Sequence, residues 1–199
     1  MQLKSVSKNV MPKIIAICGA KRSGKDLLAN YICKRYEYKK IRFADPLKAA
    51  IGILFNFSED QIDDGPMKDV IDERWGIAPR KALQFFGTEI LQYKIQDILP
   101  TVDRKFLAYS LVSKLKEEEY YVISDMRFVH EYEEILKLGG LIIRVDRPNK
   151  TVDQNHDVPV HTSEIEYRMI PFNIHIINDG DIADYIRKFE EQFSKIISV

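Results

Sequence analysis

The residues best suited to chemistry form the turn GAKRSGKD at positions 19–26. Its spacing matches the phosphate-binding pattern G-x-x-x-x-G-K, with an apolar run before it and helical spacing after it. Gly19 and Gly24 allow the tight bend that turns backbone N–H groups toward phosphate oxygens. Lys25 adds a point charge between the outer phosphates, and Lys21 and Arg22 bring further cations. The turn therefore predicts a site for a polyphosphate.

Asp26 stands where Ser or Thr usually follows the lysine and binds magnesium. A carboxylate holds Mg²⁺ directly or through water, so we expect Asp26 to be a metal ligand. The alternative is a charge that only stabilises the helix N-terminus, by about 0.3–1 kcal/mol. Because the Asp26 charge would repel phosphate, the first interpretation makes magnesium more important than usual.

A second acidic residue, Asp125, ends the apolar run Tyr120–Ser124. Ligands of parallel sheets bind at the carboxyl ends of the strands, so we expect Asp125 to support the metal; the alternative is a helix cap. Arg127 and Glu131 follow, four residues apart. They form either a helix-surface ion pair or, for Arg127, a clamp on the phosphoryl group during transfer.

Other positions suggest a second anion site. Asp45-Pro46 predicts a helix start with Asp45 as N-cap, which places Lys48 in the first turn as an anion ligand or as a solvated lysine. Gly87-Thr88 interrupts a predicted helix at a cost of about 1 kcal/mol. That cost indicates close approach of a ligand or another backbone, or else tight helix packing.

Short apolar strands alternate with helices along the chain. Strands are expected at 13–18, 40–44, 120–124, 141–145 and 173–177, and helices at 26–36, 45–55, 79–97, 103–118, 129–138 and 181–197. Continuous apolar strands indicate burial on both faces, and hence a three-layer α/β fold with a parallel sheet flanked by helices on both faces. We expect one domain over 1–199, with a small insertion at 56–78 and a lid-like loop at 147–160 that closes over the nucleotide.

Composition narrows the class of protein. The chain has 199 residues and a net charge of zero, which gives no drive toward nucleic acid or an anionic membrane. Cys18 and Cys33 are expected to be reduced thiols, and no apolar stretch approaches the roughly 20 residues of a membrane span. We therefore expect a cytoplasmic protein whose partners are small molecules.

Several blocks of sequence occur in the order found in one known family. They are Gly19–Asp26, Ala44–Lys48, Arg80–Glu89, Ser124–Arg127 with His130-Glu131, Arg147-Pro148, and Asn178–Gly180. Together they resemble the bacteriophage-type deoxynucleoside monophosphate kinases, in which an Asp also replaces the usual Ser or Thr after the lysine. The resemblance implies a P-loop kinase fold and transfer of the ATP γ-phosphate to a deoxynucleoside monophosphate.

The resemblance also implies roles for individual residues. The expected ATP contacts are Gly19, Arg22, Ser23, Gly24, Lys25 and Asp26, with Mg²⁺ at Asp26 and Asp125. The expected acceptor contacts are Lys21, Leu47, Lys48, Arg80, Gly87, Thr88, Arg127 and Glu131. The expected catalytic residues are Lys25, Asp26, Asp125 and Arg127. A homodimer is expected from base rates, and the host cytoplasm is expected if the gene is viral.

Two alternatives stay open at this point. Animal-type phosphomevalonate kinases are similar in the Ser-Gly-Lys-Asp turn and the Ser-Asp-x-Arg block, although the segment Gln84–Glu89 favours a nucleotide acceptor. A nucleotide-binding switch without an acceptor would lack a second cationic pocket, for which Lys48, Arg80 and Arg127 are candidates. The sequence leaves the preferred base and sugar open.

Overall fold

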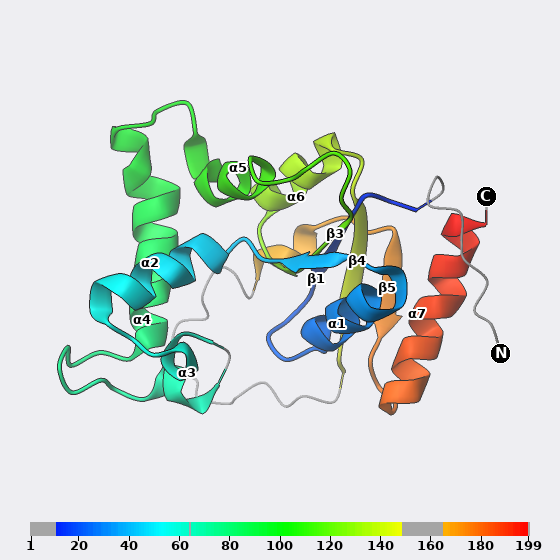
Figure 1. The fold of residues 1–199 in the computed structure, drawn as a ribbon, viewed down its shortest axis with the longest axis horizontal. Helices are drawn as coiled ribbons and strands as arrows, with labels where there is room; N and C mark the ends of the chain where they lie inside the picture. Colours follow the sequence, from blue (N-terminus) through cyan, green and yellow to red (C-terminus); the bar gives the residue numbers. More distant parts are fainter. Residues whose placement is uncertain (1–10, 64, 149–164, 199) are drawn as a thin grey trace. The chain divides into compact units, whose positions relative to one another are not determined.

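The computed structural model describes residues 11–63, 65–148 and 165–198 (Figure 1). They fall into two compact units, which we call the sheet unit (residues up to Ile41 and from Lys116 onward) and the helical unit (Arg42–Leu115). The expected lid-like loop at 147–160 lies outside the described residues from position 149 onward. The expected organisation as one domain with a small insertion stays a prediction.

The sheet unit is built on a five-stranded parallel sheet of order β2-β3-β1-β4-β5. Its strands are β1 (Ile14–Cys18), β2 (Lys39–Ile41), β3 (Tyr121–Met126), β4 (Leu141–Asp146) and β5 (Ile174–Ile177). The first strand lies in the centre, so the turn that follows it opens at the carboxyl edge of the sheet, where ligands of such sheets bind. The predicted parallel α/β sheet is confirmed.

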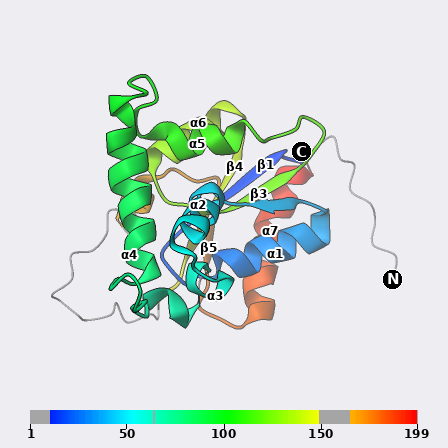
Figure 2. The same ribbon diagram turned by 60° about the vertical axis from the view of Figure 1, so that its left-hand side comes forward.

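Helices cover both faces of this sheet. On one face, Ile15 and Ile17 pack in a cluster with α1 (Lys25–Tyr36) and α7 (Ile182–Ile197), which contribute Leu28 and Phe189. On the other face Ala16, Ile123 and Ile142 are equally buried, and Figure 2 shows α6 (Val129–Lys137) on that side. Apolar burial stabilises a fold by about 25 cal/mol per Å². The continuous apolar strands are thus explained by two covered faces.

Two strand boundaries differ from expectation by more than one residue. β2 ends at Ile41 rather than at Ala44, because the chain turns there toward the next helix. β3 continues through Asp125 to Met126 rather than stopping before Asp125. The pairing of β1 with β3 shifts register between Ala16 and Cys18, and such a bulge re-aims the side chains beside it.

The helical unit contains α2 (Asp45–Phe55), α3 (Glu59–Ile62), α4 (Pro79–Gln84) and α5 (Phe106–Val112). The 3₁₀ turns η2 (Pro66–Asp69), η4 (Lys94–Asp97) and η5 (Asp103–Lys105) and the π-helix η3 (Phe85–Tyr93) join them, and η7 (Glu166–Met169) is a 3₁₀ turn of the sheet unit. Leu47, Ile51, Phe57, Ile62 and Leu83 form the core of the helical unit.

Three helix predictions need correction. Ala44, not Asp45, is the N-cap of α2, because the Asp45 carboxylate accepts hydrogen bonds from the backbone and side chain of Arg42. The helix expected over 103–118 ends at Val112. The helix expected over 79–97 exists, but its central part is a π-helix. No helix in the described parts of the chain is both long and apolar enough to cross a membrane.

Candidate functional site

The turn at positions 19–26 joins β1 to α1 and requires glycine at two positions. Gly19 has φ of 147° and Gly24 has φ of 110°, which L side chains rarely adopt. A Cβ at Gly19 would lie 2.2 Å from the carbonyl oxygen of Val145, and one at Gly24 would lie 2.6 Å from Nδ2 of Asn178. The backbone therefore passes so close to its neighbours that only glycine fits.

The shape of this turn suits an anion. Arg22 is also left-handed, with φ of 61°, and bends of this kind make successive N–H groups converge on one point. α1 begins at Lys25, directly behind the turn, so its positive dipole end faces the same point. Lys21 and Arg22 are exposed beside it. The backbone therefore has the bends that the predicted phosphate-binding turn needs, and the phosphate contacts stay a prediction.

The side chains of Lys25 and Ser23 complete the turn. Lys25 is only 6% exposed, and its ammonium group donates to the carbonyl oxygens of Gly19 at 2.9 Å and Ala20 at 2.6 Å. The Ser23 Oγ is buried with no hydrogen-bond partner among the described residues. Such an orphaned hydroxyl costs about 1–3 kcal/mol, which a phosphate oxygen would offset. The loop therefore offers a phosphate group the positive charge of Lys25 and the hydroxyl donor of Ser23.

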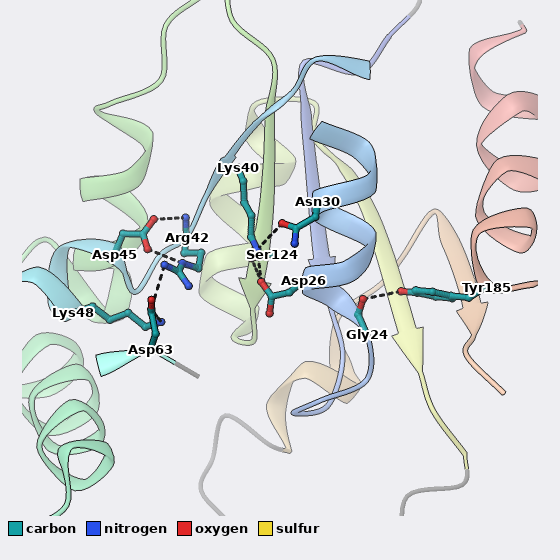
Figure 3. A network of polar contacts seen from close by, with 10 residues as sticks. All are labelled: Gly24, Asp26, Asn30, Lys40, Arg42, Asp45, Lys48, Asp63, Ser124 and Tyr185. Atoms are coloured by element: carbon teal, nitrogen blue, oxygen red, sulfur yellow. Dashed lines mark hydrogen bonds and ion pairs between the residues drawn. The ribbon is translucent and has the colours of Figure 1, made fainter. Parts of the chain in front are cut away.

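Two residues, one directly after β5 and one in α7, hold the turn in place. Asn178 donates from Nδ2 to the carbonyl oxygen of Ser23 at 2.8 Å. The Tyr185 hydroxyl donates to the carbonyl oxygen of Gly24 at 3.2 Å, as Figure 3 shows. Burial raises the pKa of Tyr185, so the phenol keeps its proton and remains a donor. Sequence reasoning placed Asn178 in a family block without a role and did not find Tyr185.

Asp26 lies in a small polar network at the start of α1 (Figure 3). Its Oδ1 accepts a hydrogen bond from the Ser124 hydroxyl at 3.1 Å and lies 2.6 Å from the Lys40 ammonium nitrogen. Lys40 also donates to Oδ1 of Asn30 at 3.1 Å. Ser124 was placed in a family block without a role, and Lys40 and Asn30 were missed, because neither their type nor their spacing marks them as partners of Asp26.

A magnesium ion fits this end of the loop. Within the described residues no group of three or more His, Cys, Asp or Glu side chains could hold a metal alone. Magnesium needs fewer protein ligands than such a group supplies, since it commonly uses one or two carboxylates together with substrate phosphates and water. The Asp26 side chain is 53% exposed and only its Oδ1 is engaged by side chains of the described residues, which leaves Oδ2 for such an ion.

Asp125 and Glu131 lie close enough to interact electrostatically. Glu131 is 4% exposed, and its Oε2 accepts hydrogen bonds from the backbone N–H groups of Arg127 at 2.8 Å and Phe128 at 3.1 Å. Burial, with the charge of Asp125, raises the pKa of Glu131 to about 8. Glu131 thus holds the Arg127 backbone at the start of α6. Phe128 is the N-cap of that helix, so Asp125 is not its cap.

In the helical unit, two predicted acceptor ligands pair with carboxylates of the segment 56–78. Lys48 is 8% exposed, and its ammonium nitrogen lies 3.2 Å from Oδ1 of Asp63 (Figure 3). Arg80 forms a two-point ion pair with Asp69, in which Nη2 donates to Oδ2 at 3.1 Å. Both cations are therefore already positioned by anionic groups.

The remaining predicted acceptor residues lie in packed surroundings. A Cβ at Gly87 would lie 2.8 Å from Cδ2 of Leu47, so the glycine in η3 allows close packing against α2. Leu47 belongs to the helical unit's core, and Thr88 is 8% exposed. Of the two interpretations of Gly87, tight helix packing is the one seen; the substrate roles stay predictions.

The structure groups the predicted site residues by unit. The sheet unit holds the loop 19–26, Asp125, Arg127 and Glu131, whereas the helical unit holds Leu47, Lys48, Arg80, Gly87 and Thr88. Elsewhere in the helical unit, Arg104 donates from Nε and Nη2 to Oε1 of the buried Gln92 at 3.1 and 3.0 Å. No signal in the sequence pairs these two residues.

Comparison with known families decides between the possible kinds of phosphate-binding protein. The sequence model described as deoxynucleotide monophosphate kinase matches residues 13–69 and 61–189, which is most of the chain. The chain belongs to the deoxynucleotide monophosphate kinase family. It is therefore a nucleotide kinase, and the resemblance in its motifs is confirmed.

Individual members of the deoxynucleotide monophosphate kinase family agree. A protein of Acanthamoeba polyphaga mimivirus, named as a candidate deoxynucleotide monophosphate kinase, is 36% identical over 194 residues, with 93% of this chain and 94% of that protein covered. The deoxynucleotide monophosphate kinase of Enterobacteria phage T4 is 22% identical over 258 residues, with 92% and 97% covered. Among solved structures, a dephospho-CoA kinase from Campylobacter jejuni is 13% identical to this chain with a TM-score of 0.46. The match covers 92% of this chain and 97% of that kinase.

Proposed function

We propose that the chain transfers the γ-phosphoryl group of ATP to a deoxynucleoside monophosphate, giving ADP and a deoxynucleoside diphosphate. The family supports a nucleotide kinase. The single observation that carries the donor side is the Lys25 ammonium group inside a turn with left-handed glycines. Beside it lies the Ser23 hydroxyl, which none of the described residues hydrogen-bonds. That combination of charge and donors suits the outer phosphates of a nucleoside triphosphate.

On the donor side, the backbone N–H groups from Gly19 to Gly24 cradle the phosphates, and Arg22 and Lys25 neutralise them. Mg²⁺ would be held by Asp26, with Asp125 ordering the metal or its waters. The ion, when bound, screens the charge between the β- and γ-phosphates. Asn178 and Tyr185 keep the turn rigid, since both hydrogen-bond its carbonyl oxygens.

On the acceptor side, Lys48 and Arg80 bind the phosphate of the deoxynucleoside monophosphate, and Lys21 and Arg127 lie at the group in transfer. Leu47, Gly87, Thr88 and Glu131 are proposed to surround the sugar and base. Asp63 and Asp69 hold the two helical-unit cations in the structure and would exchange places with the phosphate. A bidentate guanidinium suits this task because its fork matches phosphate oxygens.

The chemistry needs no covalent enzyme intermediate. An oxygen of the acceptor phosphate attacks the γ-phosphorus, the bond from the γ-phosphorus to the bridging oxygen breaks, and ADP leaves with that electron pair. Because charge spreads over the three equatorial oxygens, catalysis is mainly positioning and neutralisation. Lys25 and Arg127 are the residues we assign to that neutralisation.

The partners we propose are small nucleotides, with no nucleic acid and no membrane. A homodimer and a location in the cytoplasm, or the host cytoplasm for a viral gene, remain part of the proposal.

The test is ADP release in a coupled assay against a panel of deoxynucleoside and ribonucleoside monophosphates, phosphomevalonate and a blank. Release only with deoxynucleoside monophosphates supports the proposal. Release only with phosphomevalonate would assign the chain to a different small-molecule kinase. ATP binding without acceptor-dependent release would leave a nucleotide-binding switch. The same panel ranks the bases and sugars.

A further inference from the structure

The aspartate of the phosphate-binding loop has a cationic partner of its own. The Lys40 ammonium nitrogen lies 2.6 Å from Oδ1 of Asp26, although the two residues come from β2 and α1. Asp26 replaces a neutral hydroxyl residue, so it places an extra negative charge where a triphosphate must bind. A lysine at this distance offsets part of that negative charge, although solvent screens a pair this exposed.

The pair is built into the fold rather than formed by a loose surface lysine. Lys40 also donates to Oδ1 of Asn30 at 3.1 Å, and its side chain is 26% exposed. Ser124 fixes the same Asp26 oxygen from β3 at 3.1 Å. The neighbouring Lys39 has a 60% exposed side chain and pairs with Glu119 instead. Strand alternation thus directs Lys40, and not Lys39, to the loop.

Lys40 holds one oxygen of the carboxylate whose other oxygen would bind a metal ion. Both the ammonium group and Mg²⁺ are attracted to the Asp26 carboxylate, and each repels the other. One oxygen of the carboxylate is already held by Lys40 and Ser124, while the side chain remains half exposed. Lysine provides one charge and magnesium two, so an ion bound at Oδ2 would have to overcome repulsion from Lys40 at Oδ1.

We propose that Lys40 is a positioning residue that acts as the counter-cation of Asp26 and sets how strongly magnesium enhances nucleotide binding. This inference rests on the proposed function. Without metal, Lys40 neutralises Asp26, so a nucleotide binds without facing an unpaired carboxylate. When the nucleotide arrives with Mg²⁺, the ion takes over the charge of Asp26 and Lys40 gives way. Loss of Lys40 therefore weakens metal-free binding and increases the benefit of the metal.

The test measures binding of ADP by calorimetry, once with EDTA and once with saturating Mg²⁺. The quantity compared is the Kd in EDTA divided by the Kd in Mg²⁺. Lys40→Met is expected to raise this ratio about tenfold over the wild-type chain. Lys39→Met, which removes a lysine from the same strand, should leave the ratio within about twofold. In an Asp26→Asn background, adding Lys40→Met should also change the ratio by less than about twofold, because the shared carboxylate is gone.

Circular dichroism confirms that each variant is folded, and Lys40→Gln gives the same measurement with the polar contact to Asn30 retained. The inference is overturned if the ratio stays at the wild-type value in both Lys40→Met and Lys40→Gln. It is also overturned if Lys40→Met raises the ratio as much in the Asp26→Asn background as in the wild-type chain. In both cases wild-type binding with a magnesium effect would leave the proposed function standing. A wild-type chain that binds ADP neither with nor without magnesium overturns both proposals.

Discussion

The ammonium nitrogen of Lys25 lies 2.9 Å from the carbonyl oxygen of Gly19, so the lysine near the end of the phosphate-binding turn closes onto its first residue. A charge in this position is almost fully buried, with 6% of the residue exposed. A buried charge interacts more strongly with a phosphate than an exposed one, since solvent screens it less. The Lys25–Gly19 contact is therefore the geometric centre of the proposed donor site.

Replacing Lys25 tests its proposed role in binding the phosphates of ATP. Lys25→Met is expected to lower turnover by about 10²–10³-fold, a loss of the size seen when one transition-state donor is removed. The free energy of unfolding should fall by about 1–3 kcal/mol, because the hydrogen bonds to Gly19 and Ala20 are lost. Steady-state kinetics and urea unfolding measure the two effects. The control is Lys195→Met on the exposed side of α7, and a Lys25 variant with activity near that of the control would contradict the role.

Asn178 is predicted to keep the turn in its binding shape. Asn178→Ala removes the donor to the Ser23 carbonyl oxygen, and we expect ADP to bind about tenfold more weakly and stability to fall by about 1–3 kcal/mol. Asn173→Ala is the matched control, since its side chain makes one hydrogen bond to the backbone N–H of Ile142 in the sheet. Calorimetry should show normal ADP affinity for the control. If Asn178→Ala and Asn173→Ala lose the same amount of ADP affinity, Asn178 has only a structural role.

Glu131 is expected to make stability depend on pH. Its folded pKa of about 8 lies above the ordinary value of 4.5, so its contribution to stability is full below about 4.5 and is lost as pH rises toward 8. Glu131→Gln lacks this titration. The unfolding free energy of the wild-type chain minus that of the variant should therefore decline across this window, by up to about 1.4 kcal/mol per pH unit. Urea unfolding in chelator at several pH values measures it, with the exposed Glu133→Gln as control. A constant difference would show that Glu131 titrates normally.

Arg80 is predicted to act on the acceptor and not on ATP. Arg80→Met should raise KM for the deoxynucleoside monophosphate at least about tenfold, because a charge-assisted pair to phosphate is lost, while KM for ATP changes less than about twofold. Arg187→Met is the control, since Arg187 is 56% exposed and pairs with Asp184 and Glu191 on α7. A rise in KM for ATP alone would place Arg80 on the donor side.

Much of the fold follows from local sequence. The apolar run Ile14–Cys18 specifies a buried strand because no polar side chain interrupts it, and the run around Ile143 does so with Arg144 as its one charged residue. The sheet forms as expected. The turn at 19–26 was predictable as well, since Gly19 and Gly24 occupy backbone conformations that other residues rarely adopt. Signals of this kind are contained within a few neighbouring positions.

What could not be predicted depends on contacts between distant positions. Ser124 reaches Asp26 across 98 residues, and Tyr185 reaches Gly24 across 161, so no local spacing marks either pair. The wrong prediction of Asp45 as the N-cap of α2 has a related cause. The Asp45 carboxylate accepts a hydrogen bond from the Arg42 side chain and does not cap the helix. The helix expected to reach 118 stops at Val112, although the charged residues after it have good helix propensity; the structure gives no physical reason for this early end.

The most direct test of the central claim follows the phosphorus atoms by ³¹P NMR in a mixture of the chain, ATP, Mg²⁺ and one deoxynucleoside monophosphate. The γ-phosphate signal of ATP is expected to fall while the signals of ADP and of the deoxynucleoside diphosphate rise in equal amounts, and Lys25→Met is expected to slow this change by about 10²–10³-fold. Inorganic phosphate in place of the deoxynucleoside diphosphate, or no change with any acceptor, would contradict it.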